Sequence, residues 1–162
     1  MSGIKQLNTL SESALQEALF RVCASQTWVR SMVKGRPYKN EIGFADTAVK
    51  IWQSLSESDR LEAFSGHPRI GAKTHSVVEA VEQKGMDRST PELKVQMQKL
   101  NDRYFEKFGF IFLIHAKGKT AEEMLSAISQ RVKNGRKKEI QNASMEQEGI
   151  ILSRLGKLLE NS

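Results

Sequence analysis

The sequence around His67 combines residue types suited to proton transfer. Gly66 precedes the histidine and Pro68 follows it. Proline disfavours helical backbone in the residue before it, and glycine permits an unusual turn, so we predict that the imidazole sits in a loop between helices. An imidazole titrates near neutral pH and can accept or release a proton. We therefore expect acid–base chemistry at His67, with an ordinary surface histidine as the alternative.

A carboxylate and an amide follow on the next predicted helix. Glu82 lies four residues after Val78, at the edge of the apolar face, and Gln83 comes directly after it. An acid at that edge is placed to face a pocket. The alternative is a boundary carboxylate that pairs with Lys84 or Arg88.

A cation interrupts the apolar face of the last predicted helix. Arg154 lies four residues after Ile150 and four before Leu158. Its guanidinium is suited to bidentate hydrogen bonding with a planar carboxylate, imide or ureido group. The alternative is that the side chain extends along the helix to the surface.

The sequence predicts no metal site and no thiol nucleophile. The three histidines, His67, His75 and His115, match no standard ligand spacing. Cys23 falls in the first apolar stripe, where a small buried thiol is commonest. Gly118-Lys119-Thr120 lacks the preceding glycine and the spacing of a phosphate-binding loop.

The elements that position these residues are predicted to be helices. Apolar residues recur every three or four positions between capping residues and glycine or proline breaks. Residues 110–114 are aromatic and β-branched, so they are also compatible with a buried extended segment. We expect an all-α, compact single-domain bundle of roughly six to eight helices. The predicted helices cover residues 13–34, 44–55, 57–64, 77–85, 90–108, 120–134 and 136–159.

Length and composition restrict the class of protein. The chain has 162 residues, a net charge of +6 and one cysteine, which predicts one domain over residues 1–162 with no internal disulfide. The longest apolar run is far shorter than the roughly 20 residues that cross a bilayer. The N-terminal residues lack a basic region followed by an apolar stretch, so we expect a cytoplasmic protein without a membrane partner.

A basic cluster near the last two helices supports a different class of function. The cluster consists of Arg131, Lys133, Arg136, Lys137 and Lys138. Cations at a helix C-terminus are favoured by the dipole, so a solvated helix junction is the simplest interpretation. A basic helical module that binds nucleic acid is the competing one, and it leaves His67, Glu82 and Arg154 unexplained.

Several separate motifs occur in a fixed order along the chain. They are residues 64–71 (FSGHPRIG), Glu82-Gln83, residues 101–112 (NDRYFEKFGFIF), residues 118–125 (GKTAEEML) and Arg154-Leu155. With these motifs the sequence resembles the 2-oxo-4-hydroxy-4-carboxy-5-ureidoimidazoline (OHCU) decarboxylases of urate breakdown, which form (S)-allantoin. The similarity extends from the region of Trp28 to the C-terminus. It implies an all-helical, usually dimeric fold with a small ureidoimidazoline substrate and no metal or organic cofactor.

The resemblance also implies functions for individual residues. It makes His67 the catalytic acid or base and includes Glu82 in the catalytic set, where it holds the substrate together with Gln83. Pro68 shapes the histidine loop, and Arg154 reaches into the pocket from the last helix. The substrate-binding positions are Pro68, Gln83, Phe112, Leu113, Ile114, His115, Ala116 and Arg154.

The chain departs from the family pattern at two positions. Glu79 stands where a small hydroxyl residue is common, and His115 stands where small residues or cysteine are usual. His115 would narrow the pocket or add a second titrating group. A catalytically silent partner of another purine-pathway enzyme is a further alternative, but the complete set of His67, Glu82, Gln83 and Arg154 argues against it.

Overall fold

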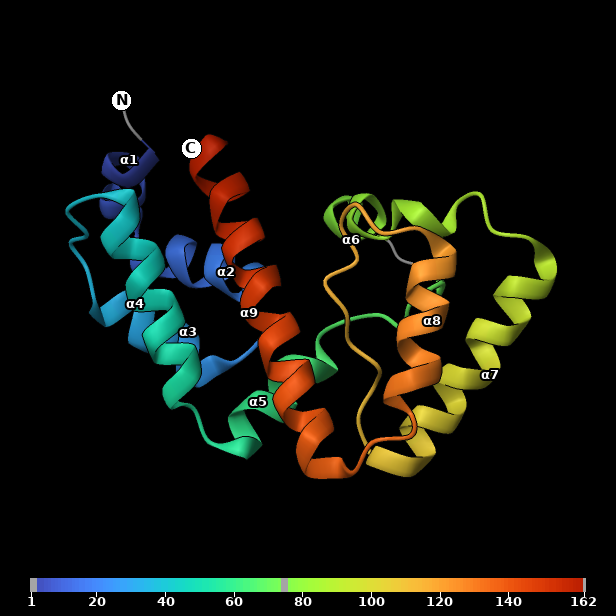
Figure 1. The fold of residues 1–162 in the computed structure, drawn as a ribbon. Coiled ribbons are helices and arrows are strands. Elements are labelled where there is room, and N and C mark those ends of the chain that lie inside the picture. The colour runs from blue at the N-terminus through green and yellow to red at the C-terminus, as the bar shows by residue number, and fades with distance from the viewer. Residues whose placement is uncertain (1–2, 74–75, 162) are drawn as a thin grey trace. The chain divides into compact units, whose positions relative to one another are not determined.

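The computed structural model describes residues 3–73 and 76–161, and every regular element in this part of the chain is helical (Figure 1). The all-α prediction is therefore confirmed. The chain divides into two compact units, Met1–Gly66 with Glu148–Ser162, and His67–Gln147. The elements are α1 (Gly3–Thr9), α2 (Glu12–Val22), α3 (Gln26–Lys34), α4 (Glu41–Ser54), α5 (Glu57–Ser65), α6 (Val77–Glu82), a 3₁₀ helix (Lys84–Met86), α7 (Pro91–Phe108), α8 (Ala121–Arg131) and α9 (Arg136–Glu160).

The first unit divides residues 13–34 into two helices, although the sequence predicts one. Cys23 is extended, and α3 begins after Ser25, whose hydroxyl accepts a hydrogen bond from the Trp28 backbone N–H at 3.2 Å. Serine caps a helix well because its oxygen satisfies a free N–H of the first turn. Together with the unpredicted α1, this division brings the described residues to nine α-helices.

Large aromatic side chains form the core of the first unit. Trp28 and Trp52 are both fully buried, and the Trp28 indole N–H donates to the Ala48 carbonyl at 3.1 Å. The rings of Trp52 and Phe64 meet edge to face with centroids 6.2 Å apart. A buried indole N–H needs such an acceptor, so this bond fixes the position of α3 relative to α4.

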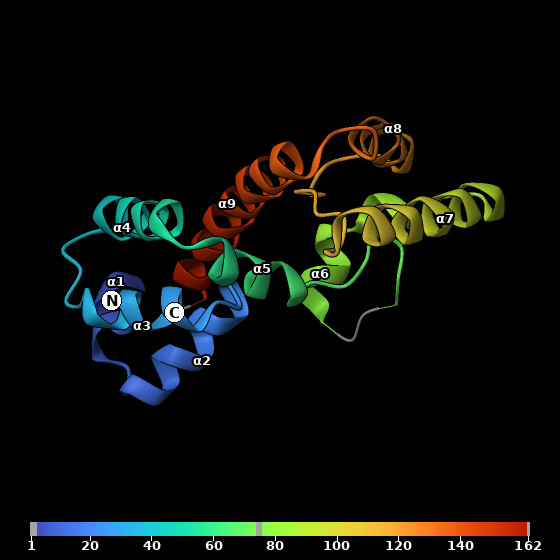
Figure 2. The same ribbon diagram turned by 90° about the horizontal axis from the view of Figure 1, so that it is seen from below.

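The second unit is built on α7 and α8, which lie side by side in both ribbon views (Figures 1 and 2). The helix α7 begins as predicted, with Thr90 as N-cap and Pro91 in the first turn. It ends at Gly109, whose φ of 79° is in the left-handed region that favours glycine. Tyr104 packs against the rings of Phe108, Phe110 and Phe112, with centroid distances of 4.5, 5.8 and 5.5 Å respectively.

A buried carboxylate joins three helices of this unit. Glu139, at the start of α9, has no exposed surface, and it accepts hydrogen bonds from four side chains. Tyr104 donates at 2.6 Å from α7, and Arg131 donates from Nε at 2.8 Å from α8. Asn134 and Asn142 donate at 2.8 and 2.7 Å. These donors replace the water that the carboxylate loses on burial.

The same arginine holds the segment after α7. Residues 110–116 have no helical or strand structure. The Nη1 atom of Arg131 donates to the Leu113 carbonyl at 2.7 Å, and its guanidinium carbon lies 4.6 Å from the centroid of the Phe112 ring. The segment is mostly buried and not helical, which agrees with the extended alternative that the sequence left open, and Arg131 anchors it at Phe112 and Leu113.

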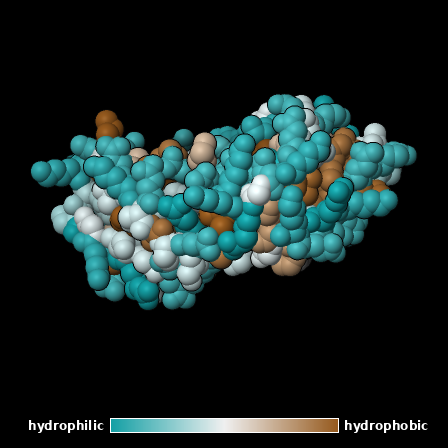
Figure 3. All heavy atoms as spheres, turned by 60° about the horizontal axis from the view of Figure 1, so that its bottom comes forward, coloured by the Kyte–Doolittle hydropathy of each residue, from teal (hydrophilic) through white to brown (hydrophobic). Residues whose placement is uncertain are grey.

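Hydrophobic side chains are scattered on the face shown in Figure 3, which is mainly hydrophilic. Ile42 and Met145 are the most exposed of the large apolar side chains, at 75% and 71%. Among the described residues, no helix is both long enough and apolar enough to cross a membrane.

We expect the free energy of unfolding to depend on the charge of Glu139. Burial alone raises the pKa of this carboxyl, but hydrogen bonds from Tyr104, Asn134 and Asn142 and the charge of Arg131 together lower it below its ordinary value. A lowered pKa stabilises the fold above the pKa of the unfolded carboxyl, about 4.3, and this contribution is lost as the pH falls through the folded value. Glu139→Gln should lower the unfolding free energy at pH 7 by about 3 kcal/mol, because the Arg131 charge loses its partner.

Urea unfolding followed by circular dichroism at pH 7 and pH 3.5 measures this effect. The difference between the parent and Glu139→Gln should shrink at the lower pH. Glu160→Gln, at the exposed end of the same helix, is the control and should change little. An equal loss in both variants would show that the buried carboxylate is not the source.

Candidate active site

His67 lies in the loop after α5, as predicted. The helix α5 ends at Ser65, and the Gly66 N–H donates to the Ala63 carbonyl at 3.2 Å, which closes the last turn. His67 and Pro68 follow without regular structure, and both side chains are partly buried. The imidazole is therefore carried on irregular backbone, a common position for a catalytic group.

The imidazole is held by an amide of α9. His67 Nε2 lies 2.7 Å from Gln147 Oε1. Gln147 is completely buried, and its Nε2 has no hydrogen-bond partner among the described residues. This residue was not predicted as a site residue, although a glutamine in the apolar stripe between Ala143 and Ile151 was a signal in the sequence.

The loop that follows His67 is tied to α7. The Ile70 carbonyl accepts a hydrogen bond from Asn101 Nδ2 at 3.0 Å, and Asn101 is itself buried. Arg69 forms an ion pair with Asp102 and lies over the Phe105 ring at 5.2 Å. These contacts connect the backbone on the C-terminal side of His67 to a long helix.

Gln83 is joined to the same loop. Its Oε1 accepts a hydrogen bond from the Gly71 backbone N–H at 3.0 Å. Gly71 has a φ of 85°, a conformation that side chains disfavour. The Gln83 side chain is thus connected to the backbone of the His67 loop by a hydrogen bond.

Glu82 is buried, with 8% of its surface exposed, whereas Val78 and Val81 on the same helix are 41% and 49% exposed. This is the reverse of an ordinary amphipathic helix. Glu82 is thus not a solvent-facing residue, and its predicted orientation toward a pocket stays a prediction. An inward carboxylate beside outward valines marks a candidate functional position.

His115 adds a second imidazole near Glu82. Its backbone N–H donates to Glu146 Oε2 at 3.1 Å. Burial lowers the pKa of the His115 imidazole, while the negative charges of Glu146 and Glu82 oppose this shift. His115 Nε2 is buried without a partner among the described residues. The ring is therefore predominantly neutral at pH 7 and offers a polar atom to the interior.

The remaining predicted lining residues form one buried strip. Of the five predicted residues between positions 112 and 116, four are at most 5% exposed, and His115 is partly buried. The buried members are Phe112, Leu113, Ile114 and Ala116.

Arg154 belongs to the first unit, on the C-terminal part of α9. Its Nη1 donates to the Arg21 carbonyl at 3.0 Å and reaches the Val22 carbonyl at 3.5 Å. These are carbonyls of the last turn of α2, where a cation is favoured by the helix dipole. The guanidinium therefore has a structural contact, and its predicted contact with substrate stays a prediction.

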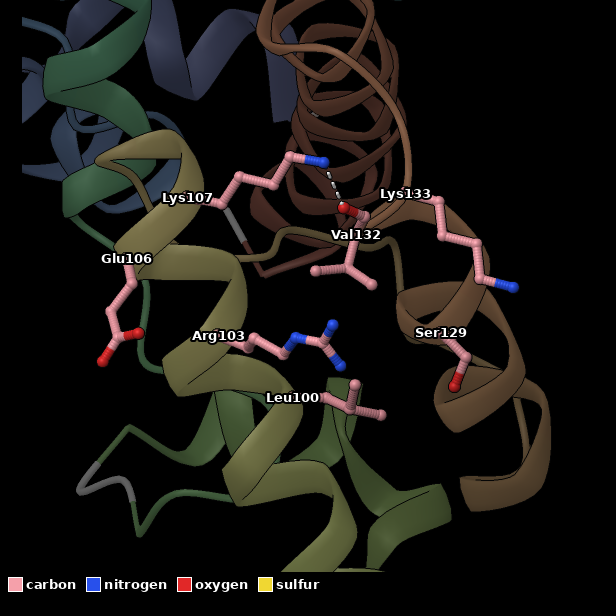
Figure 4. A pocket seen from close by; sticks show the side chains of 7 residues that line it. All are labelled: Leu100, Arg103, Glu106, Lys107, Ser129, Val132 and Lys133. Atoms are coloured by element: carbon pink, nitrogen blue, oxygen red, sulfur yellow. Dashed lines mark hydrogen bonds between the residues drawn. The ribbon is translucent and has the colours of Figure 1, made fainter.

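The basic cluster is only partly internal, because Lys133, Arg136, Lys137 and Lys138 are exposed and Arg131 is not. Arg131 is mostly buried, with 12% of its side chain exposed, and pairs with Glu139. A groove of about 790 Å³ lies between α7 and α8 (Figure 4). Lys107 and Arg103 extend toward α8 in this view, and the Lys107 ammonium donates to the Val132 carbonyl at 2.8 Å. Arg131 of the cluster and the neighbouring Lys107 thus make internal contacts, and the nucleic-acid interpretation stays an alternative that these contacts do not test.

No group of three or more His, Cys, Asp or Glu residues in the described part of the chain is arranged to hold a metal ion. His75 lies outside the described residues, so the three-histidine arrangement is not described as a whole.

The fold and the site define an all-helical protein with a loop histidine held by an amide and a buried carboxylate on a short helix. The profile of the OHCU decarboxylase family matches residues 8–156, and the chain belongs to this family. The family resemblance predicted from the sequence motifs is confirmed.

Individual relatives agree with this assignment. The chain is 28% identical over 159 residues to a 2-oxo-4-hydroxy-4-carboxy-5-ureidoimidazoline decarboxylase of Halalkalicoccus jeotgali, covering 96% of this chain and 90% of that protein. It is also 28% identical over 159 residues to a uric acid degradation bifunctional protein of Bacillus sp. (strain TB-90), but spans only 32% of that protein. A crystal structure of OHCU decarboxylase in the presence of (S)-allantoin superposes with a TM-score of 0.80 at 32% identity, covering 87% of this chain and 96% of that chain.

Cys23 is expected to be chemically inert in the folded protein. Burial raises the pKa of its thiol to about 12, and only the thiolate is a strong nucleophile. At pH 8 the reaction with 5,5′-dithiobis(2-nitrobenzoic acid) should be on the order of a thousandfold slower than in guanidinium chloride. Rapid reaction of the native protein at the denatured rate would contradict the burial of this thiol.

Proposed function

We propose that this protein catalyses the decarboxylation of OHCU to (S)-allantoin in urate degradation, as a carboxy-lyase that acts on a small ureidoimidazoline substrate. The observation that carries the proposal is the His67–Gln147 contact of 2.7 Å, which holds a titratable imidazole on the loop between α5 and α6. Family membership supports the reaction and its substrate.

The overall reaction removes one proton, from the C4 hydroxyl, and delivers two, one to a ring nitrogen and one to the neighbouring ring carbon. When the C4–carboxylate bond breaks, carbon dioxide leaves and the electron pair enters the ring, where the adjacent C=N group accepts it and its nitrogen takes up a proton. The C4 hydroxyl then loses its proton to become the carbonyl, and the neighbouring ring carbon gains a proton on one face. A group that takes a proton from oxygen and supplies one to an adjacent carbon matches an imidazole. We assign this function to His67.

The other polar groups would bind and orient the ring. Glu82 is an acceptor suited to ureido and ring N–H groups, and Gln83 adds an amide next to it. Pro68 limits the freedom of the histidine loop. The buried strip of residues 112–116 would supply an apolar wall that excludes water, with His115 as its polar member. Water exclusion strengthens each of these electrostatic contacts.

Arg154 would act on the developing negative charge of the ring oxygens. Tight pairing with the departing carboxylate would stabilise the ground state and slow the reaction, whereas contact with charge that develops later lowers the barrier. The guanidinium fork is suited to a planar ring.

We further propose that residues 1–162 function as a single domain, that the protein is a cytoplasmic homodimer, and that it uses no metal or organic cofactor and binds no nucleic acid. The family match over residues 8–156 includes parts of both units, which supports the single domain. The resemblance of the motifs supports the dimer.

His67→Asn should abolish turnover while helical content stays unchanged. Asparagine keeps a polar side chain of similar position but cannot exchange a proton near neutral pH. Circular dichroism of freshly generated OHCU follows the appearance and the sign of the allantoin signal. Full activity in this variant would remove His67 from the mechanism. A signal that follows only slow, racemic decay with the parent protein would overturn the decarboxylase proposal.

Arg154→Lys should lower kcat about tenfold with little change in KM, because a point charge cannot reproduce a bidentate hydrogen bond to charge that develops on a planar ring in the transition state. Steady-state kinetics with OHCU measure the effect, and thermal unfolding detects any loss of the contact with the Arg21 carbonyl. Arg30→Lys on the exposed surface of α3 is the matched control. If Arg154→Lys lowers only the unfolding temperature, the residue serves to cap α2.

A further inference from the structure

Gln147 occupies a position where an apolar side chain would be expected. It lies on the buried face of α9 in register with Ala143 and Ile151, and all three have no exposed surface. A buried amide is costly unless all its polar atoms are bonded. The Nε2 atom of Gln147 has no partner among the described residues, so a saturated structural network does not explain why a glutamine stands here.

The contact with His67 explains the glutamine at this buried position. Gln147 Oε1 lies 2.7 Å from His67 Nε2, well within hydrogen-bond distance. An amide oxygen only accepts, so in this arrangement Nε2 carries the hydrogen and the lone pair of the neutral ring is on Nδ1. The amide can accept this bond whether the ring is neutral or protonated. It therefore orients the ring without adding a negative charge beside it.

We propose that Gln147 is the positioning residue for His67: its carbonyl oxygen selects the Nε2–H tautomer and makes Nδ1 the atom that exchanges protons with substrate. The inference rests on the proposed function of His67. The inference goes beyond that function because it assigns the tautomer, the reactive nitrogen and the residue that determines both.

The backbone around the amide supports this function. Glu146, the preceding residue, accepts the His115 N–H at 3.1 Å, so this turn of α9 is fastened to the 110–116 segment. The His67 loop is fastened independently through Ile70 and Asn101. Both partners of the contact are thus carried on anchored backbone, which is what preorganisation of a proton-transfer group requires.

Removing the amide oxygen is the first test. Gln147→Met keeps length and removes the acceptor, and because it also removes the unpartnered buried Nε2, the unfolding temperature should be equal to or above that of the parent. We expect kcat to fall about tenfold to a hundredfold with little change in KM, because general acid–base catalysis depends on the correct tautomer. Gln141→Met, at an exposed position of the same helix, is the control.

Changing the charge of the acceptor is the second test. Gln147→Glu keeps an acceptor but places a carboxylate beside the ring, which stabilises the imidazolium. Whichever limb of the pH–rate profile belongs to His67 should move to higher pH: activity then recovers above an acidic limb, or persists to higher pH before a basic limb. Gln141→Glu controls for the added charge. The titratable residue His115 and the charged groups that act on it are unchanged in each variant: Glu82 of α6, Lys117 and Lys119 of the loop before α8, and Glu146 of α9.

The tautomer itself is measured by two-bond ¹H–¹⁵N correlation on protein labelled at its three histidines, with the His67 signals assigned from His67→Asn. The Nε2–H form in the parent and its loss in Gln147→Met support the proposal. An Nδ1–H form, or a kcat of Gln147→Met equal to that of the parent, overturns it. If the parent does not decarboxylate OHCU, the proposed function fails, and the tautomer measurement, which needs no substrate, still decides whether Gln147 orients His67.

Discussion

The buried carboxylate of Glu139 is the constraint on which the second unit depends. A charge without exposed surface is tolerated only when donors replace the lost water, and here Tyr104, Arg131, Asn134 and Asn142 supply them. Because these donors come from α7, α8, the junction before α9 and α9 itself, the charge is satisfied only when the three helices keep this arrangement. The requirement is directional, whereas the apolar packing around Tyr104 tolerates small shifts.

This constraint extends to the site through Arg131. The guanidinium that neutralises Glu139 also binds the Leu113 carbonyl and covers the Phe112 ring. A segment without regular structure has backbone groups that need partners, and this contact supplies one inside the protein. The segment carries His115, whose backbone is in turn bonded to Glu146, the neighbour of Gln147. The Glu139–Arg131 pair and the candidate histidine His67 are therefore connected within one unit by hydrogen bonds and short stretches of backbone.

Helix starts and stops were largely predictable because they depend on local chemistry. The Thr90-Pro91 start, the Gly109 stop and the capping box of Thr120 and Glu123 all lie where the motifs predict them. The division between α2 and α3 was missed, since the apolar spacing continues through it and only the buried Ser25 signals a break. The orientation of α6 was likewise beyond periodicity, because a helix that buries Glu82 and exposes Val81 contradicts the usual apolar rule.

The sequence by itself determined the all-helical class, the family and the identity of His67, Glu82 and Gln83 as candidates, because capping signals, apolar spacing and contiguous motifs are local properties of the chain. Only the tertiary structure decided which partners these residues receive. Gln147 lies 80 positions from His67, and nothing in the spacing of a glutamine within an apolar stripe says which group it will meet. Hydrogen-bond partners so far apart in the sequence are determined by how whole helices pack. The contact of Gln147 Oε1 with the imidazole, and the tautomer that we infer from it, therefore follow from the fold.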